Sequence, residues 1–354
     1  MKTYIDKQNH FMEKFDSKTG FYVRTGIIDD KGKDTGVDPF MRNFPALIDV
    51  GIMECCICAN RCNVDCYQKA CDRTGNNMSL EDYESILKQC KGRVWQIALG
   101  GAGDPDTHEN FEEILRLTSE YGIVPNFTTS GIAFTSEKAG LCKQYCGAVA
   151  VSHHGVDYTE RALDMLISTG VKTNIHYVLS AKSIDDAIDR LRNNNFHKGI
   201  NAVVFLLYKP IGLGKPELVL KPDDLRVKEF FALIDTLKFD FKIGFDSCSC
   251  AGIINNTSNI NLDSIDFCEG GRFSMYIDAH MNAMPCSFGN QDSKWFVSLR
   301  DHTIQEAWNS EVFENFRYSL RNSCMSCKDR LLCGGGCPIC RNIVLCNREE
   351  VDFK

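Results

Sequence analysis

The stretch ECCICANRCNVDCYQKAC, residues 54–71, holds six of the 19 cysteines in this 354-residue chain. A second group of six lies between residues 324 and 346. Between the two groups lie Cys248, Cys250, Cys268 and Cys286, and only Cys90, Cys142 and Cys146 stand apart, as buried free thiols do. Thiols this dense serve as disulfides, as zinc ligands or as ligands of iron–sulfur clusters.

Composition favours metal over disulfides. The net charge of −7 and the pI near 5.7 argue against a nucleic-acid-binding surface. No apolar run approaches the roughly 18–20 residues that cross a bilayer, and the first sixteen residues lack the apolar core of a secretory signal. We therefore expect a cytoplasmic protein with no membrane or nucleic-acid partner, whose thiols stay reduced and available to a metal.

Short apolar runs alternate with helical patterns through the middle of the chain. Strands are expected at residues 46–53, 94–100, 123–131, 147–153, 171–180, 201–209 and 241–247. Helical patterns separate the last six of these, with Gly170 placed to end one helix and Ser183 placed to cap the next. This alternation predicts an α/β fold with parallel strands and crossover helices, in which ligands collect at the carboxyl ends of the strands.

The alternation stops near residue 248. The remainder shows a hairpin pattern at 274–286 and one helix at 303–320, with too few apolar residues to build a core easily. Metal crosslinks would compensate for that deficit. We expect an N-terminal segment (1–44), an α/β domain (45–247) and a small loop-rich metal-binding domain (248–354).

The first cysteine group directly follows the strand at 46–53, so it lies on the functional edge. Its string CNVDC resembles the cluster loop CxxxCxxC of radical S-adenosylmethionine (SAM) enzymes, although Lys69 stands where the third cysteine would fall. The ligand set is therefore Cys58, Cys62 and Cys66, or Cys56 in place of Cys58, or Cys62, Cys66 and Cys71. The resemblance implies a partial (β/α)6 TIM-like barrel in which three thiolates hold a [4Fe–4S] cluster and the fourth iron binds SAM.

A glycine-rich turn, GGAGDP (100–105), follows the next strand at the same edge. It resembles the GGE-like motif of the same enzymes, which implies that Gly100, Gly101, Gly103 and Asp104 bind SAM. Thr128, Ser130, Ser152 and the strand at 174–180 are candidates to complete the pocket. His153 and His154 end a strand here, and ordinary hydrogen-bonded histidines explain them as well as catalysis does.

The second group, CMSCKDRLLCGGGC (324–337), together with the hairpin that ends in Pro285 and Cys286, resembles the SPASM extension of radical SAM enzymes. That resemblance implies two auxiliary [4Fe–4S] clusters. The first would be held by Cys268, Cys286 and Cys337 with Cys248 as the fourth ligand, and the second by Cys324, Cys327, Cys333 and Cys346. Cys250 and Cys340 have no assigned role.

The resemblance implies reductive cleavage of SAM to a 5′-deoxyadenosyl radical that abstracts hydrogen from a substrate. The expected substrate is a ribosomally made peptide or a protein, and the expected electron donor is a flavodoxin or ferredoxin. The first 45 residues are too short for a winged-helix leader-binding domain, so leader recognition is either absent or is expected from a separate protein or from another surface of this chain. The alternatives are a dehydrogenase of a small molecule or protein side chain, for which Asp246 is a possible base, and a non-catalytic iron–sulfur regulator.

Overall fold

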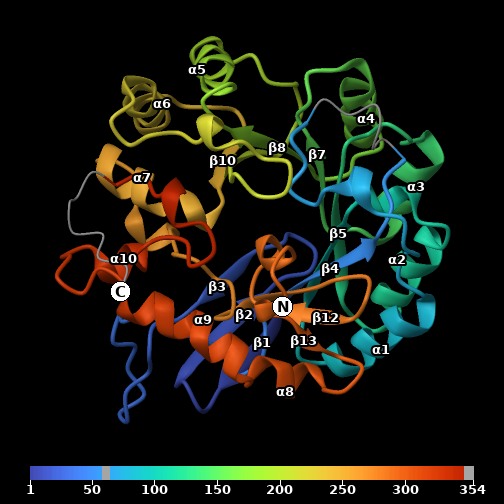
Figure 1. The fold of residues 1–354 in the computed structure, drawn as a ribbon, viewed down its shortest axis with the longest axis horizontal. Coiled ribbons are helices and arrows are strands. Elements are labelled where there is room, and N and C mark those ends of the chain that lie inside the picture. The colour runs from blue at the N-terminus through green and yellow to red at the C-terminus, as the bar shows by residue number, and fades with distance from the viewer. Residues whose placement is uncertain (58–63, 347–354) are drawn as a thin grey trace.

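The protein, described here by a computed structural model covering residues 1–57 and 64–346, is built around a ten-stranded sheet. Seven neighbouring strands are parallel and follow chain order, as Figure 1 shows. They are β4 (Leu47–Met53), β5 (Gln96–Gly101), β6 (Val124–Thr129), β7 (Val149–Ser152), β8 (Thr173–Leu179), β9 (Ala202–Leu207) and β10 (Lys242–Phe245). All seven were predicted, and the partial (β/α)6 barrel is confirmed.

Six helices connect these strands and lie on the outside of the curved sheet (Figure 1). They are α1 (Leu80–Cys90), α2 (Phe111–Glu120), α3 (Ser136–Tyr145), α4 (Asp157–Ser168), α5 (Ile184–Asn193) and α6 (Leu225–Thr236). Gly170 follows the end of α4 with a φ of +76°, as its sequence position suggested. Ser183 precedes α5, but its hydroxyl donates to Val178 O at 2.7 Å and makes no helix cap.

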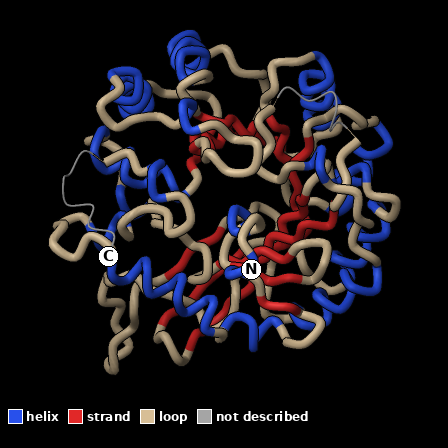
Figure 2. Tube along the Cα trace, in the orientation of Figure 1, coloured by secondary structure: helices blue, strands red, loops and turns tan. Residues whose placement is uncertain are grey.

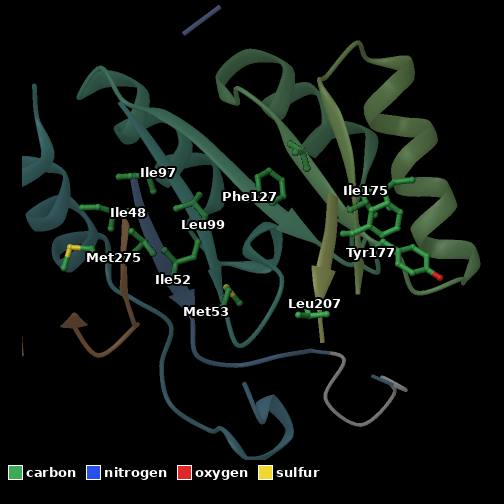
Figure 3. Packing of buried hydrophobic residues seen from close by; sticks show 14 of the residues in the cluster. Ile48, Ile52, Met53, Ile97, Leu99, Phe127, Ile175, Tyr177, Leu207 and Met275 are labelled. Carbon is green, nitrogen blue, oxygen red and sulfur yellow. The ribbon is translucent and has the colours of Figure 1, made fainter. Parts of the chain in front are cut away.

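Side chains alternate along the strands, so that one set packs between the sheet and the helices and the other set faces the inside of the barrel. On β4, Ile48, Val50 and Ile52 are fully buried in the core, where Ile48 and Ile52 pack near Ile97 and Leu99 (Figure 3). Because successive side chains of a strand point to opposite faces, Asp49 points into the barrel.

The C-terminal hairpin extends the same sheet beyond β4. β11 (Ser274–Ile277) pairs in parallel with β4 and antiparallel with β12 (Asn282–Met284), and β13 (Val297–Ser298) forms the edge. Figure 2 shows these strands continuing the barrel sheet beneath the loops that follow. The sheet therefore crosses the expected domain boundary at residue 248, and the hairpin uses the core of the barrel.

The single helix expected at residues 303–320 is two helices, which corrects that prediction. α8 (Ile304–Trp308) and α9 (Glu311–Asn322) are separated at Asn309 and Ser310. Thr303 and Glu306 form a capping box that starts α8, and Trp308 Nε1 donates to Arg42 O at 3.0 Å. The short helices α7 (Cys250–Asn256) and α10 (Arg330–Cys333) complete this region.

Residues 1–24 form a separate three-stranded antiparallel sheet: β1 (Lys2–Asp6), β2 (Phe11–Phe15) and β3 (Tyr22–Arg24). It is fixed to the C-terminal region, since Arg24 Nη2 pairs with Asp266 Oδ2 at 2.6 Å and its guanidinium lies 3.9 Å from the ring centroid of Phe273. Throughout the described part of the chain, none of the helices is both long and apolar enough to cross a membrane.

Candidate active site

The first cysteine group lies at the carboxyl end of β4, as expected. Cys58 and Cys62 lie outside the described residues, so the choice among the three ligand sets stays a prediction. Cys55 is engaged elsewhere, since its thiol donates to Gly75 O at 2.8 Å. Cys71 is exposed, with its sulfur 3.6 Å from Asp72 Oδ1.

The segment that carries Cys66 is fixed by the loop after β9. The carbonyl of Cys66 accepts a hydrogen bond from Leu213 N at 3.0 Å. The neighbouring Gly212 has a φ of +68°, and an added Cβ there would clash with the carbonyls of Cys66 and Tyr67. Glycine is therefore required for the two loops to approach this closely.

An ion pair holds the far end of the same loop. Arg73 Nη1 lies 2.7 Å from Glu54 Oε2, and Arg73 Nε donates to Gln68 O at 2.8 Å. The other oxygen of Glu54 lies 3.3 Å from Nε2 of His280, in the turn between β11 and β12. Glu54 thus links the first cysteine loop to the C-terminal hairpin.

The glycine turn after β5 packs directly on the first cysteine group. Gly101 has a φ of +122°, and a Cβ added there would clash with Met53 O. A Cβ added at Gly103 would clash with Cys55 O and lie 3.2 Å from Cys56 Cα. At Gly100, in contrast, no atom among the described residues lies within 4 Å of an added Cβ. The turn therefore touches the cysteine loop and leaves open space beside Gly100.

Asp104 and Ser130, both predicted to bind the cofactor, contact each other. Asp104 Oδ1 accepts from Ser130 N at 2.8 Å, and Oδ2 accepts from Ser130 Oγ at 2.5 Å. Burial raises the pKa of Asp104, which these hydrogen bonds oppose. The pair ties the turn after β5 to the end of β6. Ser152 ends β7 beside His176 of β8 and is half-buried.

The barrel interior carries two ionisable groups at mid-strand. Asp49 has no hydrogen-bonding partner for its carboxylate among the described residues, and burial, with a smaller effect from Glu269, raises its pKa to about 7. His176 Nδ1 lies 3.3 Å from Thr128 Oγ1, and burial lowers its pKa to about 4. Near neutral pH we therefore expect the imidazole of His176 to be neutral and the carboxyl group of Asp49 to be partly protonated.

His153 belongs to the outside of the barrel, whereas for His154 burial lowers the pKa. The His153 ring stacks on Tyr177 with centroids 5.0 Å apart and lines a cavity of about 210 Å³ with Glu160 and Arg190. Burial lowers its pKa to about 4. His153 is therefore explained by its packing against Tyr177, and its ring does not lie inside the barrel, where a catalytic group is expected.

The first predicted auxiliary set comes together from four separate segments. The thiols of Cys248 and Cys337 are hydrogen-bonding partners, which together with burial raises the pKa of Cys248. Cys268 is close enough to Cys248 and Cys286 for their charges to interact. Burial raises the pKa of Cys268 and of Cys286, the latter to about 11.

The second predicted set gathers in the same way. Cys333 interacts with the charges of Cys346, Cys324 and Cys327, and burial raises its pKa to about 11. Gly334, Gly335 and Gly336 all have positive φ values, from +62° to +92°, and an added Cβ at each would clash with a neighbouring side chain. The three glycines let the chain turn tightly between Cys333 and Cys337.

Each predicted set offers four thiols, which is the number of ligands that a [4Fe–4S] cluster takes. Within residues 1–57 and 64–346, no three His, Cys, Asp or Glu side chains are grouped as ligands of one metal ion. A [4Fe–4S] cluster needs only one thiolate at each iron, so its sulfurs stand further apart than those around one ion. Thiols protonated by burial would release their protons as iron neutralises the thiolate charge.

Comparison with known proteins agrees with this geometry. The iron–sulfur cluster-binding domain family SPASM matches residues 268–329. SuiB of Streptococcus suis bound to S-adenosylmethionine superimposes with a TM-score of 0.66 at 17% identity, covering 84% of this chain and 74% of SuiB. Among curated proteins, none matches the sequence.

Two further solved structures contain peptides. SuiB bound to its precursor peptide SuiA gives a TM-score of 0.66 at 17% identity, over 89% of this chain and 76% of SuiB. The enzyme anSMEcpe with bound AdoMet and the Cp18Cys peptide gives 0.62 at 18% identity, over 88% of this chain and 93% of that one. The chain has the fold of a radical SAM enzyme with a SPASM domain.

Cys250 and Cys340 have no role assigned from sequence. The backbone N of Cys340 donates to the sulfur of Cys337, a member of the first predicted set, at 3.3 Å. The Cys250 thiol donates to Leu332 O at 3.1 Å, and the Cys340 thiol bonds Asn342 Oδ1 at 3.2 Å. Burial raises their pKa values to about 12 and about 11. Each thiol therefore has a hydrogen-bonding partner of its own.

The sequence reasoning missed Asp49 and Lys209. A carboxylate inside the apolar run ALIDVGIM was a usable signal, because nothing in a strand core needs a charge. Lys209 has no such signal, since lysine after a strand is ordinary. Asp246, considered as a base, is instead hydrogen-bonded to Lys209 Nζ at 2.7 Å and to Ser249 Oγ at 2.9 Å.

Proposed function

We propose that the chain is a radical SAM enzyme that modifies a ribosomally made peptide. Cys66 and its neighbouring cysteines would hold a cluster whose chemistry, when it is bound, would be the one-electron reductive cleavage of SAM that allows hydrogen abstraction from the substrate. The observation that carries the proposal is the contact of the glycine turn with the cysteine loop, with open space beside Gly100.

The chain's own residues would hold and orient the reactants. Cys66 and two cysteines of the same loop would bind the cluster, and Gly100, Gly101 and Gly103 would present backbone groups to SAM. Asp104 and Ser130 would keep the turn at the barrel edge, where they are already joined by two hydrogen bonds. The polar interior near Asp49 and His176 would face the substrate.

The peptide class is supported by likeness of fold. SuiB and anSMEcpe, which share this fold, were each solved with a peptide. Two auxiliary clusters, a flavodoxin or ferredoxin donor, a separate leader-recognition protein and a cytoplasmic location belong to the same proposal.

The test is anaerobic reconstitution with iron and sulfide, followed by dithionite and SAM. We expect 5′-deoxyadenosine to form, and its absence from protein with full iron content would exclude the enzyme and favour an iron–sulfur regulator.

Gly100→Ala tests the cofactor turn directly. The added methyl group meets no described atom, so the variant should fold normally, yet it would occupy space expected to receive SAM. We expect at least a tenfold weaker SAM affinity with an unchanged Tm. Gly140→Ala, in α3, is the matched control because its added Cβ also meets nothing. Equal SAM affinity in both variants would remove the turn from the binding site.

A further inference from the structure

Lys209, directly after β9, is a buried cation. Its side chain is 4% exposed, and its Nζ donates to Asp246 Oδ2 at 2.7 Å and to Leu207 O at 2.9 Å. Nζ also lies 4.5 Å from the ring centroid of Phe288. A buried ammonium group is costly unless it is paired, so its position calls for an explanation.

The surroundings of Lys209 are thiols of the first predicted auxiliary set. Lys209 lies close enough to Cys248, Cys337 and Cys286 for charges on these groups to interact. Burial opposes the positive charge, and the Asp246 carboxylate, 2.7 Å from Nζ, stabilises it. Lysine therefore carries a fixed positive charge there at every physiological pH.

Asp246 is held as firmly as its partner. Its Oδ1 accepts from Ser249 Oγ at 2.9 Å, and its backbone N donates to Phe205 O at 3.0 Å. Asp246 stands two residues before Cys248 and is more exposed than Lys209, at 19% against 4% for the side chains. The lysine is thus the more desolvated member of the pair, and its field is screened less by water.

A cluster bound by four thiolates is anionic, and reduction adds another negative charge. A buried cation nearby stabilises the reduced form more than the oxidised form, and net charge is one of the factors that set cluster potentials. We propose that Lys209 raises the reduction potential of the cluster held by Cys248, Cys268, Cys286 and Cys337, and that Asp246 limits this effect. The inference rests on the proposed function for the identity of that cluster.

The experiment is a redox titration followed by electron paramagnetic resonance. Lys209→Met, Asp246→Asn and the double variant are compared in a Cys66→Ala background, which removes the signal of the SAM-binding cluster. Lys209→Met should shift the reduction equilibrium of one auxiliary cluster at least tenfold toward the oxidised form, which is about 59 mV for one electron. Asp246→Asn should shift it toward the reduced form, and the double variant should lie between them.

Lys209→Met and Asp246→Asn should shift the reduction potential in opposite directions. An ion pair with a purely structural role would not give opposite shifts. Shifts of the same sign, or none, in protein that keeps its iron would overturn the proposal. Should Lys209→Met lose its cluster, Asp246→Asn still has to raise the potential, and Lys209→Arg still has to keep it near the wild-type value. The result is separate from the proposed function, because potentials can be measured in protein that forms no 5′-deoxyadenosine.

Discussion

The two cysteine regions of the molecule are supported in opposite ways. The first is one short loop after β4, and neighbouring parts of the barrel position it: Gly103 after β5, Gly212 after β9 and Arg73 within the loop itself. The second draws its thiols from segments far apart in the chain, and those thiols are themselves the contacts between segments. The barrel positions the loop that would hold a cluster in the first region. In the second region, by contrast, the clusters would stabilise the fold, because they would join its segments.

Cys66→Ala should give the largest effect in the first region. With one iron ligand lost, we expect 5′-deoxyadenosine formation to fall at least about a thousandfold, because the remaining loop cannot hold a SAM-binding cluster. Most of the iron should stay bound and the Tm should change little, since the barrel does not depend on that cluster. Iron analysis and product formation under dithionite measure both.

Cys333→Ala should reverse this pattern. Losing a ligand of the second predicted auxiliary set removes a crosslink between segments, so we expect lower iron content and a loss of stability on the order of 2–4 kcal/mol. Hydrogen exchange should accelerate in α10 and at residues 334–346, while β5 to β9 stay protected. If Cys66→Ala and Cys333→Ala affected iron and stability equally, the contrast between the two regions would be wrong.

Elements fixed by local sequence were predictable, whereas elements that depend on contacts distant in the chain were not. Strands β4 to β10 were predictable because apolar runs, glycines and helix caps agree locally, as at Val149–Ser152 and Gly170. The helix break at Asn309 and Ser310 was not, because it depends on Trp308 Nε1 reaching Arg42 O from the other end of the chain. The parallel pairing of β11 with β4 is likewise a contact between residues more than 200 positions apart.

The site divides similarly. Spacing placed Cys324, Cys327, Cys333 and Cys337 in one motif. The resemblance divided them, grouping Cys337 with Cys248, and these two thiols are hydrogen-bonding partners in the structure. The ligand choice among Cys56, Cys58 and Cys71 stays open, because Cys58 and Cys62 lie outside the described residues. The role of Lys209 depends on its burial, and burial of a single lysine cannot be seen in a sequence.

Asp49 offers a pH test of the barrel interior. Its folded pKa of about 7 exceeds the value of about 3.9 for an unfolded chain, so the native state binds the extra proton between these values. The contribution of Asp49 to the free energy of unfolding is therefore fully present below about pH 4 and is lost as the pH rises through about 7. Asp49→Asn should stabilise the protein by about 2–3 kcal/mol at pH 8 and by little at pH 4, as measured by urea unfolding. A pH-independent difference would mean that the carboxyl is as well solvated as in the unfolded chain.

The smallest effect is expected where the two regions meet, at Glu54. Its carboxylate pairs with Arg73 of the first cysteine loop and lies 3.3 Å from His280 of the SPASM hairpin. Glu54 therefore joins the cysteine loop to the C-terminal region. Arg73→Met should cost about 1–2 kcal/mol, because Glu54 is buried and keeps only a half-exposed histidine as partner. It should also slow SAM cleavage up to about tenfold by loosening the segment that carries Cys66, with cluster content unchanged.

Lys88→Met is the matched control, since its ion pair with Glu84 is exposed to water, which screens it, and should contribute little to stability. His280→Ala separates the two halves of the coupling: it should reduce stability slightly and leave SAM cleavage near the wild-type rate, because Arg73 still holds the loop. If His280→Ala slowed cleavage as much as Arg73→Met, the hairpin would itself be positioning the first loop, and the two regions would act as one unit.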